Sequence, residues 1–261
     1  MVIGVAAGLG LSTNPVLADV TSGITYGASG QKLDLCRAQG KARRTALVFI
    51  HGGGFVAGDR SQMLGYCRLL AKGGFMAVTV SYRLASAGHS YPSAADDIRA
   101  AVAWIRQQSA SLPIDPDKIV LIGYSAGGTL AMTVGLDDRS GVAGVVSVAG
   151  ISDFDALLEG AVLPRLKADS RTYLGAASPA DASPLTMATS NDPAVFLFHA
   201  KDDRIVPVAQ SVAIARRLES VGAKALLRVF PDGGHGILGP NPHLNQLLTE
   251  LTRFLVAIDA Q

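Results

Sequence analysis

Residues 123–127 read Gly-Tyr-Ser-Ala-Gly, a pattern that can present a nucleophilic serine. The pattern needs a strand before it and a helix after it, because the serine must stand in a tight turn that lifts its hydroxyl above a sheet. The apolar run 118–124 predicts the strand, and the Ala-rich run 126–136 predicts the helix. Small neighbours avoid collisions with adjacent strands in such a turn. We predict that Ser125 is a nucleophile; a serine in a purely structural turn is the alternative.

A second glycine cluster, His-Gly-Gly-Gly-Phe at residues 51–55, closes the strand expected at 45–50. Consecutive glycines leave backbone N–H groups free to donate to a carbonyl oxygen as it gains negative charge. We expect Gly53 and Gly54 to supply two such donors, and Ala126, beside the serine, to supply a third. A phosphate-binding loop is the competing interpretation, but the Lys-Ser/Thr ending of that motif is absent.

A serine hydroxyl is a weak nucleophile at neutral pH, so a histidine must accept its proton and a carboxylate must orient that histidine. His235 lies in a glycine-rich stretch just after the strand expected at 225–230. Asp202 and Asp203 both follow the strand expected at 195–199, and their spacing does not separate them. We therefore predict His235 as the base and one of these two aspartates as its partner.

Other histidines and aspartates have simpler interpretations. His51 is expected to hold the glycine loop by hydrogen bonds, His199 to anchor the loop after its strand, and His243 to be solvated. Asp153 and Asp232 are weaker candidates for the acid, since Asp232 is so close in sequence to the base that turn formation is the simpler role.

From residue 45 onward, short β-branched apolar runs alternate with longer Ala-rich or Leu-rich runs, which predicts a mostly parallel sheet with helices on both faces. The expected parallel strands are residues 45–50, 77–81, 118–124, 142–149, 195–199 and 225–230. The expected helices are residues 62–71, 94–107, 126–136, 208–221 and 243–257. Weaker strands at 24–26 and 32–36 predict an antiparallel edge.

The start of the helix expected at 94–107 shows a capping pattern. Ser93 is the expected N-cap, and Asp96 reaches back to it from the third position. Asp96 and Asp97 are therefore interpreted as helix-start carboxylates rather than catalytic groups.

The length of 261 residues fits one large domain better than two small ones. We expect residues 21–261 to form it, with residues 1–20 as a signal-peptide remnant or mobile N-terminus. Residues 150–192 break the alternation with several prolines, which indicates a small cap insertion over the active site. A long connecting loop without substrate contact is the alternative.

Composition argues against several partner classes. The formal net charge is +2, and no Lys/Arg-rich block offers a nucleic-acid footprint. The apolar run at 2–11 is too short and Gly-rich to span a bilayer. Residues 16–19, Val-Leu-Ala-Asp, resemble a signal-peptidase site, so we expect a periplasmic or secreted protein, with a cytoplasmic one as the alternative. Nothing in the composition sets an oligomeric state.

The two cysteines, Cys36 and Cys67, fall in different expected elements and have no metal-ligand spacing. We expect two buried free thiols. One disulfide in an oxidising compartment is the alternative.

With these residues in place, the chain resembles the α/β-hydrolase esterases, especially the hormone-sensitive-lipase-like group and the smaller esterases related to bacterial acetylxylan and feruloyl esterases. The resemblance covers about residues 26–255 and rests on the motifs at 51–55, 81–84, 91–97, 123–128, 199–207 and 234–236. It implies an α/β-hydrolase fold with a small cap insertion.

The resemblance also bears on single residues. The family's acid loop reads H-G-x-x-D-x-x-V-P, which matches residues 199–207 with Ala200 in place of glycine, and this match selects Asp203 over Asp202. Tyr124 departs from the lipase-like group, which has an aspartate before the nucleophile. Few residues precede Tyr26 compared with that group's N-terminal helical cap, so a more open site is expected.

The expected reaction is a two-step acyl transfer from a small-molecule ester to water, without metal or cofactor, on short-chain, acetylated or feruloylated esters. An arylformamidase-like amide hydrolase and a non-catalytic hydrolase-like binding protein are the alternatives. We expect an apolar substrate pocket lined by residues beside the motifs, with core packing as the alternative for each. These residues are Phe55, Tyr124, Ile205 and Ile237.

Overall fold

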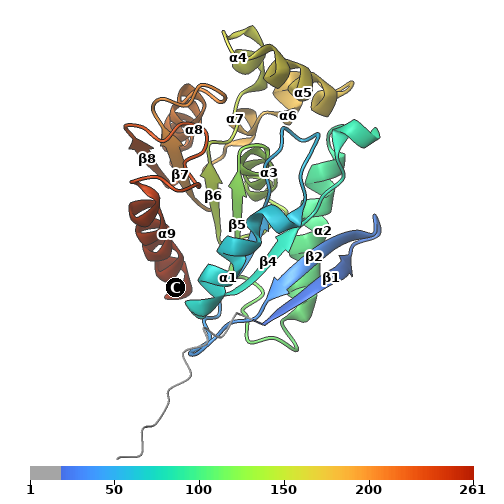
Figure 1. Ribbon diagram of the computed structural model, residues 1–261, viewed down its shortest axis with the longest axis vertical. Coiled ribbons are helices and arrows are strands. Elements are labelled where there is room, and N and C mark those ends of the chain that lie inside the picture. The colour runs from blue at the N-terminus through green and yellow to red at the C-terminus, as the bar shows by residue number, and fades with distance from the viewer. Residues whose placement is uncertain (1–18) are drawn as a thin grey trace, which may run out of the picture.

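The centre of the protein is one mixed sheet. The computed structural model describes residues 19–261, and in this range the sheet has eight strands in the order β1-β2-β4-β3-β5-β6-β7-β8 (Figure 1). The strands are β1 (Val20–Tyr26), β2 (Gln31–Cys36), β3 (Ala46–Ile50), β4 (Met76–Val80), β5 (Ile119–Tyr124), β6 (Gly144–Val148), β7 (Ala194–Ala200) and β8 (Ala225–Phe230). β1, β2 and β4 pair antiparallel, and all pairs from β4 to β8 are parallel. The predicted antiparallel edge on a parallel sheet is confirmed.

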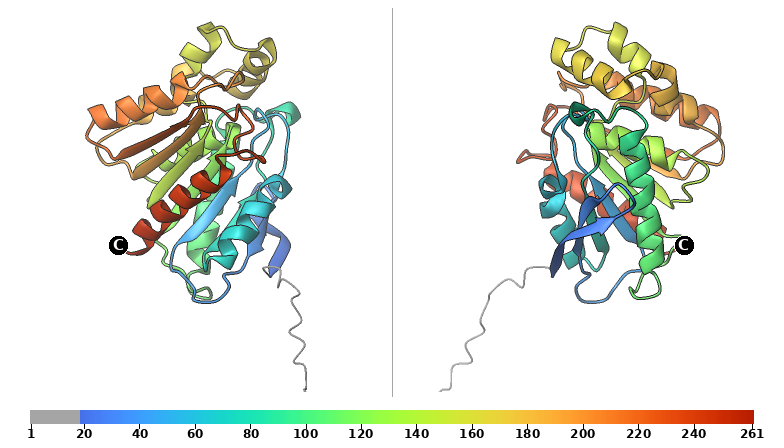
Figure 2. Two further views of the ribbon diagram at one scale, coloured as in Figure 1. Left: turned by 60° about the vertical axis from the view of Figure 1, so that its left-hand side comes forward. Right: turned by 90° about the vertical axis from the view of Figure 1, so that its right-hand side faces the viewer.

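Helices cover both faces of this sheet. The longer ones are α1 (Leu64–Lys72), α2 (Ser93–Gln108), α3 (Ala126–Gly135), α8 (Ala209–Ser220) and α9 (Leu244–Asp259). β3 shows why both faces are covered: Leu47 and Phe49 pack with α1 and α9, whereas Val48 and Ile50 pack with α2, α3 and α8. Figure 2 shows α9, in red, and α8, in orange, on opposite sides of the sheet.

Parallel pairing brings the carboxyl ends of distant strands to one edge. Ile50 pairs with Gly123, and Tyr124 pairs with Val148, so β3, β5 and β6 end side by side. β7 and β8 continue the same edge. The loops after β3, β5, β7 and β8, which carry the sequence motifs, therefore meet there.

Residues 150–192 contain α4 (Phe154–Glu159), α5 (Pro164–Leu174), α6 (Pro179–Ala182) and α7 (Pro184–Met187). These helices stand beyond one end of the sheet, at the top of Figure 1. Tyr173 of α5 stacks on Phe55 with 3.8 Å between ring centroids, and its carbonyl accepts the N–H of Tyr91. These contacts attach the segment to the end of the glycine loop at Phe55 and to the residues just before α2.

The start of α2 differs from the prediction. The helix begins at Ser93 itself, with Pro92 at the N-cap position and no side-chain cap. The N–H of Asp96 donates to the Pro92 carbonyl, so the first turn starts earlier than a Ser93 cap requires. Asp97 is no simple helix-start carboxylate either, because it is buried and accepts from the N–H and from Nε of Arg83, at 2.8 and 3.0 Å.

The two cysteines form a disulfide, so the prediction of two free thiols is wrong. Cys36 ends β2 and Cys67 lies in α1, and their Cα atoms are 6.0 Å apart. They are 31 residues apart in sequence, and it is the packing of α1 on the sheet that brings them together. The bond ties the antiparallel edge to a helix.

We expect the double substitution Cys36→Ala and Cys67→Ala to lower the free energy of unfolding by about 2–5 kcal/mol, because the disulfide restricts the unfolded chain. Urea unfolding of the oxidised protein and of the variant measures this. The reduced native protein is the control, since it loses the bond but keeps both sulfur atoms. Equal midpoints for oxidised and reduced protein would contradict the prediction.

The apolar run at 2–11 and the expected cleavage after Ala18 lie outside the described residues. Among residues 19–261, no helix combines the length and the apolar character needed to cross a membrane.

Candidate active site

Ser125 stands in a strained turn between β5 and α3. Its φ is 54° and its ψ is −122°, a backbone region that non-glycine residues rarely occupy. A Cβ at Gly123 would lie 1.9 Å from the carbonyl oxygen of Gly127, and a Cβ at Gly127 would lie 2.1 Å from that of Ile50. The turn is therefore closed to any side chain at these two positions.

Ser125, His235 and Asp203 meet from three loops. Oγ of Ser125 is 2.9 Å from Nε2 of His235, whose Nδ1 is 2.7 Å from Oδ2 of Asp203. These distances allow Nδ1–H to donate to the carboxylate, which leaves the Nε2 lone pair facing the hydroxyl. The arrangement can pass the serine proton to the imidazole.

Four donors converge on the Asp203 carboxylate. Besides His235, Nε2 of His199 lies 3.2 Å from Oδ2, and Oδ1 accepts the N–H groups of Ile205 and Val206 at 2.8 and 3.0 Å. Burial by itself raises the pKa of Asp203, but the hydrogen bonds from His199 and His235 outweigh it and hold this pKa well below its usual 3.8. The group is ionised at neutral pH and can stabilise an imidazolium.

His199 anchors the loop after β7, as expected. Its Nε2 is 2.9 Å from the carbonyl oxygen of Val206, and its Nδ1 is 2.7 Å from Oγ of Ser211. Because the Val206 carbonyl and the Asp203 carboxylate only accept, Nε2 carries a proton, and in the neutral ring Nδ1 accepts from the Ser211 hydroxyl. No local motif indicated that this second imidazole also contacts the Asp203 carboxylate.

The glycine loop after β3 carries free backbone donors. φ is 114° at Gly53 and 61° at Gly54, and a Cβ at Gly53 would lie 2.0 Å from the carbonyl oxygen of Ala57. Among residues 19–261, the N–H groups of Gly53, Gly54 and Ala126 donate to no protein acceptor. Gly53 and Gly54 line the same cleft as Ser125, so their amides are available to a carbonyl oxygen there, and Ala126 directly follows Ser125 at the start of α3.

His51 supports this loop from the buried side. Its Nδ1 is 2.7 Å from the carbonyl oxygen of Gly52, its ring stacks on Tyr82 at 4.2 Å, and the Tyr82 hydroxyl donates to its carbonyl at 3.0 Å. Burial lowers the pKa of His51, which favours the neutral ring. These contacts agree with the expected scaffold role.

A cleft of about 530 Å³ opens beside Ser125, a volume in the usual range for small-molecule sites. Tyr124 and Ile205, two of the four expected substrate-binding residues, line it. The full lining is Gly52, Gly53, Gly54, Gln62, Tyr124, Ser125, Leu163, Arg165, Leu166, Asp169, Ile205 and His235.

Phe55 and Ile237 are not among the lining residues, so the pocket prediction is wrong for them. Their exposed fractions are 1% and 0%. Phe55 packs against Tyr173 and Phe154, and Ile237 packs in the core with α9. Phe55 ends one motif and Ile237 follows another, but both side chains turn into the apolar interior, because removing a large apolar side chain from water is favourable.

Residues 33–218, more than half of the chain, match the BD-FAE family model. The chain belongs to the BD-FAE family. Esterase LipC of Mycobacterium tuberculosis is 27% identical over 274 residues, which cover 88% of this chain and 66% of that protein. Esterase LipQ of the same organism is 28% identical over 231 residues, which cover 78% of this chain and 53% of that protein. The chain thus spans between about half and two thirds of these relatives' length.

Solved structures share the fold of this BD-FAE family member. Esterase 2 of Thermogutta terrifontis, phosphonylated by sarin, has a TM-score of 0.79 at 27% identity, covering 92% of this chain and 95% of that one. Its butyrate-bound form has a TM-score of 0.78 at 28% identity, covering 92% and 94%. A truncated carbohydrate esterase from gut microbiota has a TM-score of 0.81 at 23% identity, covering 94% and 98%. The predicted α/β-hydrolase fold is confirmed.

Several cleft residues of this BD-FAE family member were missed by sequence reasoning. The missed residues are Gln62, Leu163, Arg165, Leu166 and Asp169. Most lie at or near the start of α5, where no local motif marks them. The one available signal was the expected position of residues 150–192 over the active site.

Tyr124 links the serine turn to the histidine loop. Its hydroxyl donates to the carbonyl oxygen of His235 at 2.6 Å. Burial, assisted by the charge of Asp203, raises the pKa of Tyr124 to about 12, so the phenol stays a donor. Asp202 accepts the N–H of Gly234 at 2.8 Å and holds the same loop.

The remaining acid candidates have structural partners. Asp232 lies 2.8 Å from Nε2 of His243, whose ring also stacks on Phe230. The side chain of His243 is 18% exposed, and the prediction that it is solvated is wrong, because a carboxylate hydrogen-bond partner and an aromatic face hold it. Asp153 caps α4 by accepting the N–H of Ala156 at 3.0 Å.

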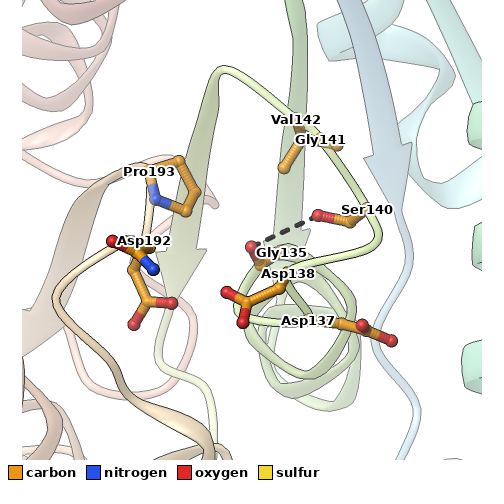
Figure 3. Close-up of a pocket in the computed structure, with 9 residues that line it drawn as sticks. Gly135, Asp137, Asp138, Ser140, Gly141, Val142, Asp192 and Pro193 are labelled. Atoms are coloured by element: carbon orange, nitrogen blue, oxygen red, sulfur yellow. Dashed lines mark hydrogen bonds between the residues drawn. The ribbon is translucent and has the colours of Figure 1, made fainter.

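A separate acidic pocket of about 360 Å³ lies at the carboxyl end of α3 (Figure 3). Asp137 there is bound by Arg139 and Arg99, and the hydrogen bond from Arg139 is the main reason that the pKa of Asp137 falls to about 2.

Across residues 19–261, no group of three or more His, Cys, Asp or Glu side chains is arranged to hold a metal ion.

Proposed function

We propose that this protein is a serine carboxylic ester hydrolase in which Ser125, His235 and Asp203 form a catalytic triad. The observation that carries the proposal is the continuous set of contacts from hydroxyl to imidazole to carboxylate, at 2.9 and 2.7 Å, beside backbone amides that have no acceptor within residues 19–261. Membership of the BD-FAE family and similarity to named esterases support the same reaction class.

In the first half-reaction, Nε2 of His235 takes the hydroxyl proton as Oγ of Ser125 attacks the ester carbonyl carbon. The carbonyl oxygen gains negative charge, which the N–H groups of Gly53, Gly54 and Ala126 stabilise. The imidazolium then gives its proton to the alcohol oxygen as the C–O bond breaks. The alcohol leaves, and the acyl group stays on the serine.

In the second half-reaction, His235 takes a proton from water, and the resulting hydroxide attacks the acyl–serine carbonyl. The proton returns to Oγ of Ser125 as the acid leaves. Asp203 stays ionised throughout and stabilises the imidazolium formed in each half.

The cleft supports small esters as substrates. Leu163, Leu166 and Ile205 give it apolar walls beside the serine, and its volume admits a short acyl chain or one aromatic acyl group. The similar Thermogutta terrifontis esterase has been solved with butyrate bound. Short-chain, acetylated and feruloylated esters are therefore the proposed class.

We expect a fluorophosphonate probe to label the protein at Ser125 only and to abolish hydrolysis of p-nitrophenyl butyrate, because the activated hydroxyl attacks phosphorus as it attacks a carbonyl. Peptide mass spectrometry locates the label. Protein unfolded in urea is the control and should not react. A folded protein that neither reacts nor hydrolyses the ester would be a hydrolase-like binding protein instead.

A substrate panel separates ester from amide hydrolysis. Acetyl, butyryl, octanoyl and feruloyl esters are compared with N-formylkynurenine under the same conditions. Higher kcat/KM for N-formylkynurenine than for every ester would replace the esterase proposal by an arylformamidase-like one.

We also propose that the protein works in an oxidising compartment, periplasmic or extracellular. The disulfide between Cys36 and Cys67 supports this location, because such bonds persist where the cytosolic thiol pool does not reach.

A further inference from the structure

Asp169, on α5, places a carboxylate at the wall of the cleft beside the glycine loop. Its Oδ2 lies 3.1 Å from the point where a Cβ on Gly54 would stand. Its side chain is 24% exposed and lines the cleft together with Ser125. No donor within residues 19–261 makes a side-chain hydrogen bond to this carboxylate. The group is thus a charged acceptor that a bound molecule can reach.

Arg165 neutralises this charge only weakly. Its Nε is 3.6 Å from Oδ2 of Asp169, and its side chain is 86% exposed. An ion pair with so exposed a partner contributes little and is easily broken. Asp169 is therefore the more buried charge of the cleft, and Arg165 is the more exposed one.

At this position the negative charge of Asp169 opposes the proposed reaction, unless the charge of a bound substrate offsets it. Negative charge develops on the carbonyl oxygen beside the amide of Gly54, and a second negative charge on the adjoining wall disfavours it. Leu166, which is 8% exposed, lines the same cleft and reduces the screening by water, so the charge of Asp169 acts on an ionised group of a bound ester more than it would in open solvent.

We propose that Asp169 is a specificity-determining residue that favours esters carrying a cationic group near the scissile bond over esters carrying a carboxylate. The inference rests on the proposed ester hydrolysis and names a charge preference within it.

Two matched pairs of esters test this preference. One pair carries the charge on the acyl side: the p-nitrophenyl esters of 4-(trimethylammonio)butyrate and of monoanionic glutarate. The other carries it on the alcohol side: butyrylcholine and O-butyrylglycolate. The readout is the ratio of kcat/KM for the cationic ester to that for the anionic ester, with neutral p-nitrophenyl butyrate as reference.

We expect Asp169→Asn to lower this ratio about fivefold in at least one pair, as the loss of one partly exposed charge should. Arg165→Gln should raise it. Asp155→Asn is the matched control, because it removes the same charge from an exposed position on α4 that does not line the cleft. In the native protein, raising the salt concentration to about 1 M should move the ratio toward that of Asp169→Asn, and the ratio of Asp169→Asn should respond less.

A folded Asp169→Asn variant whose ratio stays within about twofold of the native value in both pairs overturns the proposal. In that case, continued hydrolysis of p-nitrophenyl butyrate by the native protein leaves the ester hydrolase function standing. A native protein that hydrolyses no ester, neutral or charged, overturns both.

Discussion

Replacing Ser125 by alanine should lower kcat for p-nitrophenyl butyrate by on the order of 10⁶-fold. His235 then has no hydroxyl to deprotonate at 2.9 Å, and no acyl–serine can form. Alanine keeps the Cβ that already sits in the turn with φ 54°, so the variant should fold with nearly the native melting temperature. Initial rates and thermal unfolding measure the two quantities separately.

Ser147→Ala is the matched control for this variant. Ser147 is a buried serine on β6, and within the described part of the chain its Oγ has no hydrogen-bond partner. Its loss should change kcat by less than about threefold. Retained turnover in Ser125→Ala, or an equal loss in both variants, would remove Ser125 from the role of nucleophile.

Replacing Asp203 by asparagine should lower kcat by about 10⁴-fold. The asparagine oxygen can still accept the N–H groups of Ile205 and Val206, but its NH₂ group then faces the Nδ1–H of His235 and the Nε2–H of His199. Donor faces donor, so His235 is driven to the tautomer that carries its proton on Nε2. That tautomer cannot accept the serine proton.

Asp202→Asn is the matched control, because it makes the same chemical change one residue earlier. Asp202 accepts the N–H of Gly234, a bond that an asparagine oxygen can keep. We expect a loss in kcat below about tenfold. Equal losses of kcat at positions 202 and 203 would mean that kcat depends on the conformation of this loop rather than on the carboxylate of Asp203.

The Asp203→Asn variant should also change unfolding in acid. Because the pKa of Asp203 in the folded protein lies below its usual 3.8, the ionised group contributes stability above that value. This contribution is lost as the pH falls through the lower folded-state pKa. Melting temperatures measured from neutral pH down into this acid range should therefore fall more steeply for the native protein than for the variant.

The strands, the main helices and the turn at Ser125 could be predicted from the sequence because each depends on residues that are close together in the chain. A run of β-branched apolar residues is typical of a parallel strand that is buried on both faces. The turn at Ser125 excludes side chains at Gly123 and Gly127 by contacts with backbone atoms, so glycine is required there. The parallel direction of β5 to β8 then accounts for the presence of the serine and histidine loops at the same sheet edge.

The separation of Asp202 from Asp203 shows the limit of spacing. The two are adjacent and equally acidic, yet Asp203 is buried under His235 and His199, whereas Asp202 is exposed and binds Gly234. Only the family resemblance separated them before the structure. Burial depends on how the loop after β7 folds over the sheet edge, which no run of a few residues specifies.

The sequence by itself determined the α/β architecture and the glycine-rich loops around Ser125, because periodicity and steric exclusion act between near neighbours in the chain. The tertiary structure alone decided that Cys36 meets Cys67, that Phe55 turns into the core, and that Asp169 of α5 lies beside Gly54. Each of these contacts joins segments far apart in sequence, and their distance is set by how whole helices pack on the sheet.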